Sequence, residues 1–246
     1  MIHYHGGPIT PDTCAVKAWK GAHACISYAA PQQIALAASI CQSFIIDNGA
    51  FTFWRQGRAV DWAEFYDWCN AWIYHPGCDF VVAPDVIEGT EDQNDDLLAE
   101  CPLPRHRIAP VWHINESIDR LVMLAEEYSR VCIGSSGEFD VTKPEAFLQR
   151  AHQAIGAIST TNGQPITRLH GLRCLNPELF TALPLAGADS TMIARNIGID
   201  SAWKGTYQPR SKETRTVILR ERIEEFNGAC RLGDRPHQFS LFGEAA

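Results

Sequence analysis

Short apolar runs alternate with amphipathic stretches along most of this chain, and this alternation constrains the fold more than any other feature. Eight runs have the length and composition of buried strands. They are residues 2–5, 24–28, 43–47, 79–85, 107–112, 130–134, 166–171 and 187–194. Nearly continuous apolar strands separated by helices are typical of a parallel sheet covered by helices. Eight such units in 246 residues predict an α/β fold of the (β/α)₈ barrel type. An open doubly wound sheet is the alternative.

The segments between these runs carry helix signals. At residues 10–21, we expect Thr10 to be the N-cap, Pro11 the first helical residue and Gly21 the residue just past the end. Residues 60–74 and 115–129 have apolar side chains at helical spacing, and Asn115 is the expected cap of the second. Further helices are expected at residues 31–41, 143–159, 176–183 and about 210–228.

No linker-like segment divides the chain. We therefore expect one catalytic barrel domain over residues 1–203, with residues 204–246 as a C-terminal helical extension packed on the barrel. The oligomeric state stays open.

Composition indicates a globular protein of a reducing compartment. Hydrophobic residues make up 46% and the net charge is −8, so a general basic surface for nucleic acid is excluded. Nine cysteines occur without any CxxC or CxC pair, which gives no signal for zinc or dithiol chemistry. We find neither a signal peptide nor a run of 18 apolar residues, so we expect a cytoplasmic protein without membrane contact.

The ends of the expected strands carry unusual side chains. Because the reacting groups of parallel barrels lie at the carboxyl ends of the strands, these side chains should converge on one face. The set comprises Asp47, Asp85, His113, residues 134–138, His170, Asp189 and Arg195.

Each of these residues has a simpler explanation when taken alone. Asp47-Asn48-Gly49 is a turn sequence, Asp189 would form a salt bridge with Arg195, and a single histidine is more often a core residue. Their shared position at strand ends favours a functional site. Three carboxylates would bind a hard cation, or they would divide nucleophilic, acid–base and base-recognition roles. The chain has no HExxH, Walker A, GxSxG or GxGxxG motif.

The order and spacing of the strand-end motifs resemble the tRNA-guanine transglycosylase family, a (β/α)₈ barrel that exchanges guanine for a 7-deazaguanine base. The resemblance covers roughly residues 43–196 and rests on six segments. These are IIDNGAF, VAPD, APVW, CIGSSGE, LHGL and LAGADSTMIARN. Trp112 replaces a glutamine of the family, and the family's CxCxxC zinc motif is absent. The chain is most similar to the phage and bacterial branch that inserts 7-deazaguanines into DNA.

The resemblance implies a role for each matching residue. Asp189 would attack the sugar C1′ and hold a covalent nucleic-acid intermediate, and Asp47, which the turn presents opposite Asp189, would be the general acid and base. Asp85 would accept hydrogen bonds from the Watson–Crick edge of the base. Stacking is expected from Phe51 or Trp112. The remaining expected substrate-binding residues are His113, Gly134, Ser135, His170 and Arg195. No metal or cofactor is implied.

The implied partners are DNA, or less favourably tRNA, and a free 7-deazaguanine base such as preQ0. A flipped-out base would enter the barrel mouth. Residues 204–222 form a basic stretch, which predicts contacts to phosphates or simply a solvated helix face. Its expected phosphate-binding residues are Lys204, Arg210, Lys212 and Arg215.

Two other functions compete with base exchange. The His-x-His sequence at residues 3–5 suggests a metal-dependent barrel hydrolase with His3, His5, His170 and Asp189 as its site. A barrel without catalysis that only binds nucleic acid or a partner is the third hypothesis.

Overall fold

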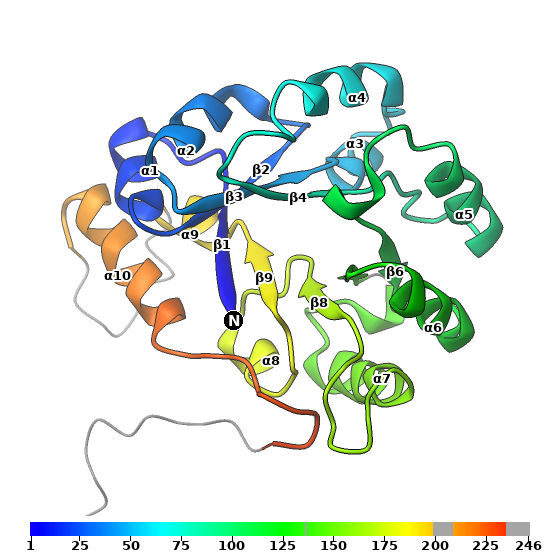
Figure 1. Ribbon diagram of the computed structural model, residues 1–246. Helices are drawn as coiled ribbons and strands as arrows, with labels where there is room; N and C mark the ends of the chain where they lie inside the picture. Colours follow the sequence, from blue (N-terminus) through cyan, green and yellow to red (C-terminus); the bar gives the residue numbers. More distant parts are fainter. Residues whose placement is uncertain (136, 199–208, 235–246) are drawn as a thin grey trace, which may run out of the picture.

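The protein is a nearly closed parallel barrel with helices on its outside (Figure 1). The computed structural model describes residues 1–135, 137–198 and 209–234. Nine strands form one sheet in the order β5-β4-β3-β2-β1-β9-β8-β7-β6, and every pairing is parallel. The strands are β1 (Ile2–Gly6), β2 (His23–Ser27), β3 (Ser43–Asp47), β4 (Cys78–Val82), β5 (Ile108–Ala109), β6 (Val111–His113), β7 (Arg130–Gly134), β8 (Arg168–Gly171) and β9 (Gly187–Ser190). The barrel prediction is confirmed.

The fifth expected strand, residues 107–112, is divided at Pro110 into β5 and β6. Proline has no N–H to donate to a sheet ladder. The two pieces bond to different neighbours, because the Ala109 carbonyl accepts from Ala83 N (2.9 Å) and the Pro110 carbonyl accepts from Cys132 N (2.8 Å). This short segment therefore bridges β4 and β7, and it brings the two edges of the sheet together.

Ten α-helices occur in the part of the chain that the structure describes. They are α1 (Asp12–Trp19), α2 (Ile34–Ile40), α3 (Ala50–Arg55), α4 (Trp62–Asn70), α5 (Glu91–Ala99), α6 (Ile118–Glu127), α7 (Pro144–Ala157), α8 (Pro177–Phe180), α9 (Met192–Asn196) and α10 (Lys212–Glu224). Helices α3, α5 and α9 were not expected. The last expected strand, residues 187–194, ends at Ser190, and α9 follows it.

Two expected helix caps are wrong. Helix α1 begins one residue later than predicted, so Pro11 and not Thr10 is the N-cap residue. Helix α6 is capped by Ser117 and not by Asn115, because the Ser117 hydroxyl accepts a hydrogen bond from Arg120 N at 3.2 Å. Gly21 does follow α1 with a left-handed φ of 69°, as its position predicted.

Side chains alternate between the barrel interior and the helix layer. The interior cluster draws residues from seven strands: Tyr4, Cys25, Ile45, Phe80, Val82, Ala109, Val111 and Cys132. Their sequence neighbours, such as Ile26, Ile46 and Val81, belong to the outer core under the helices. Because successive side chains on a strand point to opposite faces, Ser27, Asp47 and His113 continue the interior rows at the carboxyl ends of their strands.

The amino-terminal end of the barrel is closed by a polar cluster around Asp79. The Tyr4 hydroxyl donates to Asp79 Oδ2. Arg130 Nη1 lies 3.3 Å from the same oxygen, and its guanidinium lies 4.2 Å from the centre of the Phe80 ring. This plug leaves the opposite end of the barrel as the site for a ligand.

Helix α10 packs beside α1 on the outside of the barrel (Figure 1). Its Leu219 and Ile223 are buried in the outer core. Glu224 lies 3.0 Å from Nε2 of the buried His5. Among the described residues, no helix combines the length and the apolar character needed to cross a bilayer.

Candidate active site

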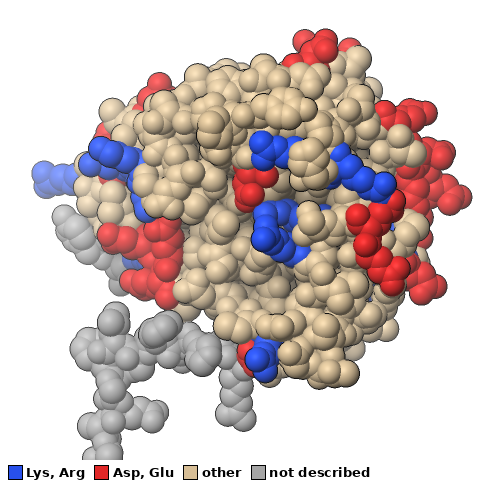
Figure 2. Space-filling view, in the orientation of Figure 1, with Lys and Arg blue, Asp and Glu red and all other residues tan. Residues whose placement is uncertain are grey.

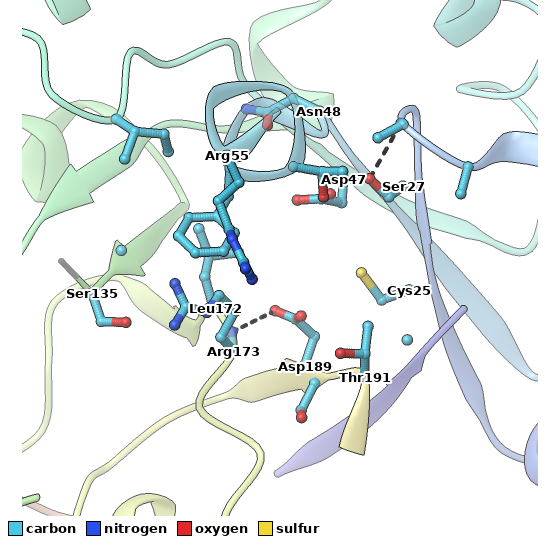
Figure 3. A pocket seen from close by; sticks show the side chains of 18 of the residues that line it. Cys25, Ser27, Asp47, Asn48, Arg55, Ser135, Leu172, Arg173, Asp189 and Thr191 are labelled. Carbon is cyan, nitrogen blue, oxygen red and sulfur yellow. Dashed lines mark hydrogen bonds between the residues drawn. The ribbon is translucent and has the colours of Figure 1, made fainter. Parts of the chain in front are cut away.

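A cavity of about 800 Å³ lies at the carboxyl ends of the strands. This volume suits a nucleoside-sized ligand. All predicted catalytic and substrate-binding residues line it except Trp112 and His170. The predicted residues in its wall are Asp47, Phe51, Asp85, His113, Gly134, Ser135, Asp189 and Arg195. Figure 3 shows Asp47 and Asp189 pointing toward one another, with Cys25 beside them.

The turn after β3 presents Asp47 to the cavity. Gly49 adopts a left-handed φ of 77°, and a Cβ on it would lie 2.8 Å from Ala29 N. Glycine is therefore required at this position. The Gly49 N–H donates to Asp47 Oδ2 at 3.1 Å, and Ala50 N donates to Asn48 Oδ1 at 2.9 Å. The sequence Asp-Asn-Gly thus forms a turn, and the same turn fixes the carboxyl group.

The pKa of the Asp47 carboxyl lies near neutral pH. Burial raises the pKa of its carboxyl to about 7, with further upward contributions from the charges of Asp189 and Asp85. Hydrogen bonds from the Ser27 hydroxyl and the Gly49 N–H oppose this rise. Asp47 is half-buried and lines the cavity. A carboxyl with such a pKa can both donate and accept a proton.

Asp189 is held through one oxygen. Its Oδ1 lies 3.2 Å from His170 Nε2 and accepts from Arg173 N at 3.3 Å. The hydrogen bonds of the described residues to nitrogen both involve Oδ1, and the thiol of Cys25 also lies within hydrogen-bonding reach of the Asp189 carboxyl. Arg173 adopts a φ of 57°, a left-handed conformation that is uncommon for a residue with a side chain. This strained backbone aims the Arg173 N–H at Asp189.

His170 lies behind Asp189 and not in the cavity wall. It is fully buried in the barrel interior, where its ring packs edge-on against Tyr4 (5.5 Å) and Phe80 (5.2 Å). His170 is not one of the residues that line the cavity, and Asp189, which its Nε2 contacts, is. Its contact to Asp189 makes it a support for that carboxylate. The expected Asp189–Arg195 salt bridge is absent among the contacts of the described residues, although Arg195 lines the cavity.

Asp85 is oriented by an amide and an imidazole. Asn48 Nδ2 donates to Asp85 Oδ1 at 2.7 Å, and His113 Nε2 lies 3.0 Å from Oδ2. Burial lowers the pKa of His113, but the contact of its ring with Asp85 and the charges of Asp85 and Glu116 outweigh burial, so the pKa is raised. Each carboxylate oxygen has a second lone pair, so Asp85 can still accept N–H groups of a ligand.

Phe51 and Trp112 differ in their availability to a ligand. Phe51 lines the cavity, and the Arg173 guanidinium lies 4.0 Å from the centre of its ring. Trp112 is fully buried in the outer core and its Nε1 donates to the Ser117 carbonyl at 2.8 Å. Trp112 therefore cannot stack on a bound ring, because it points away from the barrel axis.

A buried network supports the loop that carries Asp85. Arg120 Nη1 donates to Glu116 Oε2 (2.6 Å) and to the Val111 carbonyl (2.9 Å). Glu116 accepts from Asn94 Nδ2 (3.0 Å) and from His113 N (2.9 Å). Asn94 Oδ1 in turn accepts from Val86 N at 2.7 Å, directly after Asp85. This network was not predicted, since its members are far apart in sequence and lie in polar segments.

Arg120→Met should lower the free energy of unfolding by about 3–5 kcal/mol, because it leaves the buried Glu116 without its cation. Urea unfolding measures the change. The double variant Glu116→Gln/Arg120→Met should recover part of the loss, since no charge then remains unpaired. A loss below about 1 kcal/mol in the single variant would contradict the role of this network.

The four residues of the predicted metal site do not come together. His170 and Asp189 belong to the barrel interior, whereas His3 and His5 face the helix layer, where His3 packs on Phe180 (5.5 Å) and His5 contacts Glu224. This separation follows from strand alternation around Tyr4, which points inward. Within the described ranges, no group of three or more His, Cys, Asp or Glu side chains is arranged to hold a metal ion.

The predicted phosphate-binding residues near α10 differ in their surroundings. Lys204 lies outside the described residues. Arg210 and Lys212 are exposed at the start of α10. Arg215 instead donates to the carbonyls of Pro209 (2.7 Å) and Ile197 (3.1 Å), so its guanidinium stabilises the fold. Figure 2 shows acidic as well as basic side chains over α1 and α10, and a further acidic group over α5.

Several cavity residues were missed at the sequence level, among them two residues of β2 and two arginines. Cys25 and Ser27 belong to β2, Arg55 ends α3 and Arg173 follows β8. The alternation of side-chain direction along β2 could have identified Cys25 and Ser27, because both occupy positions whose side chains point into the barrel. Burial and the charges of Asp189 and Asp47 raise the pKa of the Cys25 thiol well above its ordinary value, so Cys25 is a neutral neighbour of the two acids.

Comparison with known proteins adds no relative: no family model, curated protein or solved structure matches this chain. The function has to be argued from the geometry and chemistry of the cavity.

Proposed function

We propose that this protein is a base-exchange transglycosylase, which replaces guanine in nucleic acid with a 7-deazaguanine base through a covalent Asp189–sugar intermediate. One observation carries the proposal: Asp47 and Asp189 share one cavity, and the pKa of Asp47 is raised to about 7. A carboxyl group with a raised pKa that transfers protons, paired with a second carboxyl group that acts as the nucleophile, is the machinery of retaining glycosyl transfer.

Asp189 is the nucleophile in this mechanism. Its Oδ2 attacks C1′ of the guanosine and the bond between C1′ and the base nitrogen breaks, with the electron pair leaving on guanine. Asp47 donates its proton to the departing base. The contacts of Oδ1 with His170 and Arg173 N hold the carboxylate while Oδ2 reacts.

The second half of the reaction reverses these roles. The ionised Asp47 accepts the proton from the nitrogen of the incoming 7-deazaguanine, and that nitrogen attacks C1′. The ester bond between Asp189 and the sugar breaks, which releases the carboxylate. Atoms and charges balance over the cycle because Asp47 regains the proton that it gave to guanine.

Asp85 serves base recognition in this proposal. Guanine and 7-deazaguanines share a donor edge with N–H groups, and a carboxylate is a pure acceptor for such an edge. Asn48 and His113 fix the plane of the Asp85 carboxylate before the base arrives. Preorganised acceptors of this kind give specificity because they lose little freedom on binding.

DNA is the favoured nucleic acid over tRNA. The resemblance to the DNA-modifying branch and the absence of a CxCxxC motif support this preference. The exposed Arg210 and Lys212 support it only weakly, since acidic side chains lie nearby.

The test is an exchange assay with a labelled 7-deazaguanine base. The protein should incorporate label into guanine-containing duplex or single-stranded DNA and release an equal amount of guanine. Asp119→Asn, an exposed change on α6, is the matched control and should keep the wild-type rate. Absence of incorporation into DNA and into tRNA alike would refute the proposal.

A further inference from the structure

Three of the described residues in the cavity wall have a buried polar atom without a hydrogen-bond partner, and one of these atoms, His113 Nε2, lies 3.0 Å from Asp85 Oδ2. The other two belong to Ser135 and Arg173. Ser135 is 8% exposed, and its Oγ has no hydrogen-bond partner among the described residues. Nη1 of Arg173 is also buried without a partner. Both residues line the cavity. Buried polar groups are normally hydrogen-bonded, so unpaired ones in a cavity wall point to a ligand that completes them.

The Arg173 guanidinium is held by two contacts, neither of which involves its Nη1. Its Nη2 donates to Asp140 Oδ2 at 3.1 Å, and its plane lies over the Phe51 ring at 4.0 Å. These two contacts fix the group and leave Nη1 unpaired. A guanidinium held in this way is preorganised for an oxyanion such as a carboxylate or a phosphate.

Arg55 adds a second cation to the same region. Its guanidinium lies 6.0 Å from the centre of the Phe51 ring and has no hydrogen-bond partner among the described residues. Figure 3 shows Arg55 reaching into the cavity, with Ser135 on one side of it and Asp47 and Cys25 on the other. The cavity thus has an acidic side, where Asp47 and Asp189 face each other, and a basic side.

We propose that Ser135, Arg55 and Arg173 form a phosphate-binding subsite that holds a phosphate group of the nucleotide whose base is exchanged. This inference rests on the proposed function. The free bases are neutral and do not require two guanidinium groups, whereas a phosphate offers the acceptors that Ser135 Oγ, Arg55 and Arg173 Nη1 lack.

The source of the phosphate is either the terminal group of a mononucleotide or an internal phosphodiester of a polynucleotide. Both present the same anionic oxygens, so the subsite chemistry is shared. Three ligands distinguish the two sources of the phosphate. They are deoxyguanosine, deoxyguanosine 5′-monophosphate and a short single-stranded DNA with one guanine. If only the monophosphate binds more tightly than deoxyguanosine, the subsite holds a terminal phosphate. If both phosphate ligands bind more tightly than deoxyguanosine, it holds a phosphate of the polynucleotide backbone.

The test is titration calorimetry at constant ionic strength. Wild-type protein should bind at least one phosphate ligand roughly tenfold or more tightly than deoxyguanosine, as expected for charge-assisted hydrogen bonds. Arg55→Gln and Ser135→Ala should each reduce this ratio severalfold, and together they should bring it close to one. Arg58→Gln is the matched control, because Arg58 contacts Phe53 (4.9 Å) and does not line the cavity.

Equal affinity of the wild type for all three ligands would overturn the subsite. An unchanged ratio in Arg55→Gln and Ser135→Ala would do so as well. Arg55 is exposed at the end of α3, so its variant should fold even if a change at the strained Arg173 does not. These measurements need no turnover, so they can fail while base exchange is observed, or succeed while exchange is absent.

Discussion

Asp189→Asn should reduce base exchange on the order of 10⁴-fold or more, because an amide cannot form the glycosyl ester that carries the sugar between the two bases. The side chain keeps its shape, and the amide oxygen can still accept from Arg173 N. Initial rates of labelled-base incorporation measure the effect.

The thermal midpoint of this variant serves as the folding check. It should stay within a few degrees of the wild type, and Asp119→Asn should match the wild-type rate. Substantial exchange in a folded Asp189→Asn protein would remove Asp189 from the nucleophile's role.

Asp47→Asn should stabilise the protein increasingly as pH rises. In the folded protein the pKa of Asp47 is about 7, against an ordinary value of 3.8 for an aspartate carboxyl. Below 3.8 the carboxyl is protonated in both states. Between the two values only the unfolded state ionises, so wild-type stability falls with rising pH until the folded carboxyl ionises near 7. The neutral asparagine does not lose this stability.

The expected size of this effect is on the order of 2 kcal/mol between pH 5 and pH 8, in favour of the variant. Because solvent enters the cavity, this difference in the free energy of unfolding should be smaller than the full pKa shift would give. Urea unfolding of both proteins at the two pH values measures it. A constant difference across this range would contradict a buried, protonated Asp47.

The same substitution should lower exchange by roughly 10²–10⁴-fold, the usual contribution of a general acid and base. Wild-type activity should fall above pH 7, as Asp47 loses the proton that guanine needs on departure. This fall in activity above pH 7 should be absent in Asp47→Asn. If the variant still loses activity above pH 7, the loss belongs to the titration of another group.

The barrel could be predicted because strand and helix periods are local properties. Buried strands between amphipathic helices leave few alternatives, and proline and glycine mark several boundaries. Helix α5 was missed because its sequence is polar, although Thr90 and Gln93 form a capping box that the sequence displays. Helix α3 was missed because Asn48-Gly49 was taken only as a turn, while the helix begins at the next residue.

Side-chain direction limited the prediction of the site. Trp112 lies between Val111 and His113, which both point inward, so a shift of one residue decides whether it reaches the cavity or the outer core. The side chain of His170 points into the barrel interior, as its position in the strand predicts, but it lies one layer below the cavity. Arg173 carries no sequence signal, because its conformation and its contacts depend on the assembled loops.

The central claim is a covalent bond between Asp189 and the sugar. Its most direct test is to mix the protein with guanine-containing DNA, denature it rapidly, separate the products on a denaturing gel and map the adduct by mass spectrometry. The account predicts a protein–DNA adduct on the peptide that contains Asp189, absent in Asp189→Asn and lost when 7-deazaguanine is added. An adduct on another residue, or none under conditions in which exchange proceeds, would contradict it.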